Sequence, residues 1–128
     1  MKNIALLLLS LLTLQLPLLA ADKKFVVMIA GKQSHGPGAH EHNAGVLLLA
    51  KCLREGAGEL VEVKTHLNGE WPADDVIARA DTILIYADGY SFHPAVQKDR
   101  LSQLTKEMKR GCGFVTLHWA TEVLKDKG

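Results

Sequence analysis

The chain has few of the residues that mark several classes of protein. Only two cysteines, Cys52 and Cys112, occur among its 128 residues, which excludes a domain built on disulfides. Lysine and arginine (15) nearly balance aspartate and glutamate (14), so no strong net charge favours nucleic acid or an anionic membrane. The GxGxxG pattern and the Gly-Lys-Ser/Thr ending of a P-loop are also missing. We therefore expect no nucleic-acid partner and no nucleotide cofactor.

One long apolar run is present, and it lies at the N-terminus. A positive start at Lys2 is followed by apolar residues 4–19 and by small residues at Ala20 and Ala21, the pattern of a secretory signal peptide. The run is short for a membrane-spanning helix, which needs about 20 residues, although an uncleaved anchor is the alternative. We predict that residues 1–21 are a signal peptide, that the protein is secreted or periplasmic, and that no membrane attachment remains after cleavage. Export would permit a disulfide, but Cys52 in a predicted helix and Cys112 before a predicted strand favour two free, buried thiols.

The rest of the chain alternates between strand and helix patterns. Continuous or alternating apolar residues predict strands at 25–30, 59–67, 82–87 and 113–118, and apolar stripes predict helices at 43–55, 73–80 and 96–110. This alternation implies right-handed crossovers, and hence an α/β fold with a flavodoxin-like, doubly wound parallel sheet of order 2-1-3-4. Residues 22–128 would form this single domain. Such sheets usually continue to a fifth strand, so we expect this to be the N-terminal part of a C-terminally truncated domain.

Two helices carry more specific expectations. Asn43 is expected to cap the first helix, and the apolar residues Leu47 and Leu48 widen its stripe so that the helix should be largely covered. In the third helix, Leu101, Leu104 and Met108 should point inward.

Histidines follow or close the predicted strands. Because ligands bind at the carboxyl ends of strands in open parallel sheets, one edge of the fold should collect them. The first loop supplies Ser34, His35, Gly36, His40, Glu41 and His42, which we predict to bind substrate. His66, at the end of the second strand, would lie one strand further out. Within the first loop, His40 and His42, with His35 nearby, could also bind a metal, but no HExxH or CxxC spacing occurs, so we expect hydrogen-bonding side chains, no metal and no cofactor.

The later loops supply the remaining candidates. Asp88 and His93 could form an acid/base pair, with Tyr90 beside them; alternatively, Asp88 or Ser91 merely caps the turn and His93 merely precedes Pro94. His118 leaves the fourth strand at a position where doubly wound enzymes place catalytic groups, or is a satisfied core histidine; Trp119 could stack on a sugar or cover the sheet edge. We predict Asp88, His93 and His118 as catalytic, and Tyr90 and Trp119 as substrate-binding. A Ser-His-Asp hydrolase is less well supported, because neither Ser34 nor Ser91 lies in a GxSxG elbow.

The same residues resemble the ThuA-like (trehalose utilisation) family. The matching pieces are Gly31-Lys-x-Ser-His35-Gly, His40-Glu-His42-Asn43, Tyr86-x-Asp88-Gly, His93-Pro94 and Gly113-Phe-Val-x-Leu-His118. The resemblance spans about residues 24–128 and implies a glutamine amidotransferase-like fold and a role in sugar utilisation. The sequence differs from that superfamily at one point. His118 occupies the elbow where glutamine amidotransferases carry a cysteine nucleophile, and glutamine amidotransferase activity is therefore not expected.

The leading hypothesis is an exported ThuA-like domain that binds, and transforms, a small carbohydrate or keto-sugar. Asp88 or His93 would be the general base, His118 would supply acid or electrostatic help, and the first loop would hold hydroxyl groups. Two alternatives stay open: a non-catalytic sugar-binding module of a larger secreted protein, and a metal-dependent hydrolase. The sequence does not indicate an oligomeric state.

Overall fold

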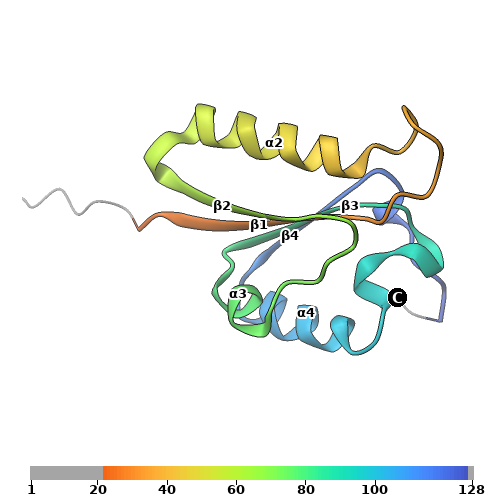
Figure 1. Cartoon of the computed structure of the whole chain (residues 1–128). Coiled ribbons are helices and arrows are strands. Elements are labelled where there is room, and N and C mark those ends of the chain that lie inside the picture. The colour runs from red at the N-terminus through yellow and green to blue at the C-terminus, as the bar shows by residue number, and fades with distance from the viewer. Residues whose placement is uncertain (1–21, 127–128) are drawn as a thin grey trace, which may run out of the picture.

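The computed structural model describes residues 22–126, so the predicted signal peptide lies outside the described part of the chain. Four strands alternate with three α-helices in the order β1, α2, β2, α3, β3, α4, β4 (Figure 1). The strands are β1 (Lys24–Ala30), β2 (Val61–His66), β3 (Thr82–Tyr86) and β4 (Gly113–Leu117). The helices are α2 (His42–Ala57), α3 (Asp74–Arg79) and α4 (Arg100–Lys109). Short 3-10 turns follow β3 and β4 and precede β2.

All strand pairs are parallel, and the sheet order is β2-β1-β3-β4. β1 is therefore central, with Val26 beside Val63 on one side and beside Thr82 on the other. This confirms the predicted flavodoxin-like order 2-1-3-4. The order follows from right-handed crossovers, which place the first helix and the later helices on opposite faces of the sheet.

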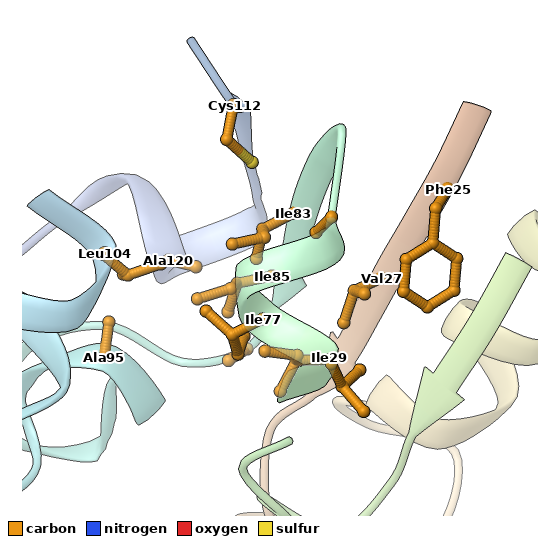
Figure 2. Close-up of a cluster of buried hydrophobic side chains, with 13 residues drawn as sticks. Phe25, Val27, Ile29, Ile77, Ile83, Ile85, Ala95, Leu104, Cys112 and Ala120 are labelled. Atoms are coloured by element: carbon orange, nitrogen blue, oxygen red, sulfur yellow. The ribbon is translucent and has the colours of Figure 1, made fainter. Parts of the chain in front are cut away.

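The helices cover the sheet from both faces, α2 on one side and α3 with α4 on the other (Figure 1). The larger core lies between β1, β3 and the α3–α4 layer, where Ile29, Ile77, Ile83 and Ile85 are almost fully buried (Figure 2). Burying each of these side chains contributes about 1.5–3 kcal/mol, so this cluster holds the layers together. A second core, under α2, contains Val26, Met28, Val46, Ala50 and Val63.

Helix α2 is less covered than its sequence suggested. Leu47 and Leu48 are 48% and 61% exposed, so the expectation of a largely covered helix is wrong. The helix lies against β1 and β2 along one stripe only, which includes Val46 and Ala50. Its N-cap is Glu41 and not Asn43, whose side chain instead accepts from the Asn68 backbone N–H at 2.9 Å. Asn43, the predicted cap, therefore connects α2 to the turn after β2 through this hydrogen bond.

Helix α4 is shorter than predicted: it begins at Arg100 instead of near residue 96, and residues 94–96 form a separate 3-10 turn before it. Leu104 is buried as expected, but Met108 is 49% exposed and Glu107 is buried in its place. The Glu107 carboxylate accepts from Arg110 Nε at 2.7 Å, and another Arg110 nitrogen donates to the Ala80 carbonyl. This pairing is what allows a carboxylate to be buried there.

Both cysteines are free, as expected, but only Cys112 is buried; Cys52 is exposed on α2. Within residues 22–126, no helix is both long enough and apolar enough to cross a bilayer.

Candidate functional site

The loops that follow β1, β3 and β4 meet at the carboxyl edge of the sheet. The Gly31 N–H donates to the Tyr86 carbonyl at 2.9 Å, so the first and third loops leave the sheet side by side. The Tyr90 N–H donates to the Glu122 carbonyl at 3.0 Å, which joins the third loop to the segment after β4. These bonds bring residues that lie up to about 80 positions apart in the sequence into one site, as the parallel topology predicts.

Asp88 is the centre of this site. Its Oδ1 atom lies 2.9 Å from His40 Nδ1, 3.7 Å from His42 Nε2 and 3.7 Å from His118 Nε2. The side chain is only 8% exposed. One carboxylate from the third loop therefore faces imidazoles from the first and the fourth.

Burial opposes ionisation of the Asp88 carboxyl, but the nearby Ser34 hydroxyl and the charges of the neighbouring imidazoles outweigh it and lower the pKa of Asp88. The carboxylate form is thus favoured at neutral pH. An ionised carboxylate among imidazoles can accept a proton or bind a cation.

His42 is held in one orientation at the start of α2. It is 2% exposed, and its Nδ1 atom lies 3.1 Å from the Lys32 carbonyl oxygen. A carbonyl can only accept, so Nδ1 carries the hydrogen and donates. In the neutral ring, Nε2 then presents a lone pair toward Asp88.

His40 is more open and is supported by Ser34. The Ser34 hydroxyl lies 3.2 Å from His40 Nδ1 and is in hydrogen-bonding geometry with it. Asp88 Oδ1 is closer to the same nitrogen, at 2.9 Å, but the geometry is not that of a hydrogen bond. The Ser34 hydroxyl also lies 3.0 Å from His35 Nδ1. His35 itself is exposed, with its ring centroid 3.9 Å from that of His40, and forms the outer part of the site.

His118 occupies a sharp elbow directly after β4. Its φ angle is 61°, in the left-handed region that non-glycine residues seldom adopt. His40 and Tyr90 have φ angles of 52° and also lie at this edge. Such conformations gather at functional sites, where surrounding contacts maintain them. The elbow directs the His118 ring to His40, with centroids 4.8 Å apart, and Trp119 stacks on His118 with its ring also 5.9 Å from that of His40.

His93 lies apart from this cluster. It is 1% exposed; its Nδ1 atom accepts from the Ala95 N–H at 3.0 Å, and Nε2 donates to the Ala120 carbonyl at 3.1 Å. Burial lowers the pKa of His93, so the neutral ring is favoured. Both ring nitrogens are engaged in the fold, so the structure gives His93 a positioning role between the third and fourth loops.

The other predicted residues border the site or stabilise its loops. Glu41 accepts from the Gly38 N–H at 2.8 Å and so closes the first loop, while Gly36 is exposed and a Cβ added there would meet nothing within 4 Å. His66 is buried at the end of β2, one strand out, and lies 3.4 Å from Glu70. Neither cysteine belongs to the site, since Cys112 precedes β4 and Cys52 lies in the middle of α2.

A cleft of about 1000 Å³ opens beside the cluster. Asp88 forms part of its wall, together with Ser34, His35, Tyr90 and Trp119. Three aromatic side chains at the cleft are strongly exposed: Tyr90 (49%), Phe92 (74%) and Trp119 (51%). Exposed aromatic faces beside polar groups suit a ligand that has both hydroxyl groups and apolar faces.

The charge of the lining narrows the kind of ligand. Lys32, Lys98 and Arg100 line the cleft, and Asp88 is its one acidic residue. This balance favours a neutral or an anionic small molecule in the cleft over a positively charged organic one. Phe92 and these basic residues were not predicted from the sequence, because nothing in their local pattern distinguishes them from ordinary surface side chains.

The arrangement permits proton transfer or metal binding, and it lacks a cysteine nucleophile. Comparisons of the chain with family models, with curated proteins and with solved structures find no match, so the resemblance to ThuA-like proteins stays a prediction.

Proposed function

We propose that this protein is an exported, ThuA-like domain that binds a small carbohydrate or keto-sugar in the cleft and transforms it with Asp88 and the adjacent imidazoles. The single observation that carries this proposal is the position of Asp88. It belongs both to the wall of the cleft and to the histidine cluster, so a ligand in the cleft reaches the one group that faces three imidazoles.

The proposed roles follow from exposure and charge. Asp88 is the proton acceptor, because its pKa is lowered and it is ionised at neutral pH. His118, whose side chain is 32% exposed and 3.7 Å from Asp88, is the proton donor. Ser34 and His35 hold substrate hydroxyls, and Trp119 offers a face on which a sugar ring can stack. His93 has no chemical role here, in contrast to the expectation from sequence.

The first experiment measures turnover of trehalose, glucose and their keto derivatives by NMR, and binding of the same compounds by calorimetry. We expect Asp88→Asn to lower turnover at least about 100-fold, because it removes the proton acceptor while keeping its shape. Binding should change much less. Asp75→Asn is the matched control, since Asp75 is an exposed carboxylate on α3, away from this cleft.

The outcomes separate the candidate functions. Equal turnover by wild type and Asp88→Asn would reject the proposed chemistry. Saturable binding with no product after long incubation would instead identify a non-catalytic sugar-binding module.

A further inference from the structure

Four potential metal ligands converge at the centre of the site. One ring nitrogen each from His40, His42 and His118 and one oxygen of Asp88 all lie within 4.8 Å of one another. They come from three loops that are distant in sequence. Three imidazoles and a carboxylate are the donor types that zinc and other divalent first-row transition metals prefer.

Two buried atoms at this point lack hydrogen-bond partners among the described residues. They are His42 Nε2 and Asp88 Oδ1, and they lie 3.7 Å apart. Because His42 Nδ1 donates to the Lys32 carbonyl, the neutral ring has a lone pair on Nε2. A lone pair and a carboxylate oxygen would then face each other inside the protein, which is unfavourable unless positive charge lies between them.

We propose that His40, His42, Asp88 and His118 bind one divalent first-row transition metal ion, for which zinc is the probe. Tetrahedral nitrogen and oxygen ligands at 2.0–2.2 Å from zinc are about 3.3–3.6 Å from one another. The distances of 2.9, 3.7 and 3.7 Å from Asp88 Oδ1 to the three histidines bracket this range. Only small side-chain movements are needed to close the wider separations.

The surroundings of the cluster also match those of metal sites. Histidine ligands commonly donate their second ring nitrogen to a carbonyl or carboxylate, which fixes the tautomer. His42 does this through Nδ1 and the Lys32 carbonyl oxygen, 3.1 Å apart. The inner ligands His42 and Asp88 are buried, whereas His40 and His118 have side chains 21% and 32% exposed, which gives an ion a route from solvent.

This inference deepens the proposed function, because it shares Asp88 and His118 with it, but metal binding does not depend on sugar turnover. With the ion bound, Asp88 is a ligand, and the ion supplies Lewis acidity and lowers the pKa of a bound water. Zinc accepts a fifth ligand in some catalytic sites, so four protein ligands leave room for a water or a substrate oxygen.

The test is a zinc titration of the chelator-treated, sugar-free full chain by calorimetry, together with cobalt(II) absorption spectroscopy. We expect one ion per chain and visible cobalt bands typical of nitrogen and oxygen ligands. His118→Ala and Asp88→Asn should each weaken zinc binding at least about tenfold, since each removes one ligand. His118 is the more exposed of the two, so its variant is the one expected to keep the fold, which circular dichroism verifies.

His35→Ala is the matched control. His35 lies in the same loop and contacts His40, but it is outside the group of four, so its removal should weaken zinc binding clearly less than the loss of a ligand in His118→Ala does. Absence of 1:1 zinc binding by the wild-type chain would overturn the proposal, as would a folded His118→Ala that binds zinc like wild type. Equal losses in His35→Ala and His118→Ala would place the ion elsewhere.

The two proposals fail separately. Sugar turnover together with no 1:1 zinc binding in the titration would retain the proposed function and reject the metal site. Stoichiometric zinc binding without sugar turnover would retain the metal site and reject the proposed sugar chemistry.

Discussion

At the scale of single residues, the two most buried histidines of the carboxyl edge differ in what their ring nitrogens contact. His42 has one nitrogen bonded to a carbonyl and the other facing Asp88, whereas His93 has both nitrogens bonded to backbone. The first arrangement leaves a lone pair for chemistry. The second joins two loops and leaves none.

Replacing His93 should therefore reduce stability. His93→Ala leaves the Ala95 N–H and the Ala120 carbonyl without their buried partner, and we expect the free energy of unfolding to fall by about 2–4 kcal/mol. Urea unfolding followed by circular dichroism measures this. The exposed His35→Ala should shift stability by less than about 0.5 kcal/mol, and a similarly small change in His93→Ala would contradict the positioning role.

The same residue should make stability depend on pH. Burial lowers the pKa of His93 in the folded state below the ordinary value of 6.5, so below that pH the unfolded chain binds a proton that the folded chain does not. The His93 contribution is fully present above about pH 6.5 and is lost as the pH falls toward the folded-state pKa. Unfolding curves at pH 7.5 and 5.5 should show a smaller difference in His93→Ala than in wild type; an unchanged difference would assign the pH dependence to other groups.

At the scale of elements, helix α2 is placed by a close contact with β3. A Cβ atom at Gly45 would collide with the Tyr86 ring, so the helix can approach the sheet only because this residue has no side chain. Gly45→Ala should lower the free energy of unfolding by about 1–3 kcal/mol through overpacking, despite the better helix propensity of alanine.

Gly56 provides the matched control in the same helix. No atom lies within 4 Å of a Cβ there, so Gly56→Ala should stabilise the protein by about 0.5–1 kcal/mol. Thermal unfolding of both variants gives the signs directly. If both shift the melting temperature in the same direction, contact with Tyr86 does not determine the position of α2.

At the scale of the whole molecule, the site exists because three loops are held at one edge. Gly89 is a point of close contact between two of them: a Cβ there would collide with the Trp119 carbonyl and lie 2.7 Å from the Glu122 carbonyl. Gly89→Ala should force the third and fourth loops apart and separate Asp88 from His118. We expect zinc affinity to fall at least about tenfold while far-UV circular dichroism stays native.

Gly36→Ala tests whether any change in these loops would have the same effect. Gly36 lies in the first loop with no neighbour within 4 Å of a Cβ, so zinc affinity should stay within about twofold of wild type. Native zinc affinity in Gly89→Ala would show that the ligands do not depend on this contact.

The sequence by itself determined the alternation of strands and helices, the sheet order and the edge at which the histidines gather. Apolar periodicity is a local property, and the right-handed crossover rule converts it into topology without knowledge of individual contacts. The position of His118 after β4 and of Asp88 after β3 followed from the same reasoning. Element ends were less predictable, as the 3-10 turn before α4 shows, because loop contacts decide where a helix begins.

Only the tertiary structure decided which of these residues face one another. The spacing of residues suggests metal ligands only within the first loop, whereas the group of four takes His40 and His42 from that loop, Asp88 from the third and His118 from the fourth. The sequence also groups His93 with Asp88, although in the structure both ring nitrogens of His93 bond to backbone atoms in the protein interior. Side-chain direction at these positions depends on left-handed backbone at His40 and His118 and on hydrogen bonds between loops. Those are long-range properties, and no local pattern of residues encodes them.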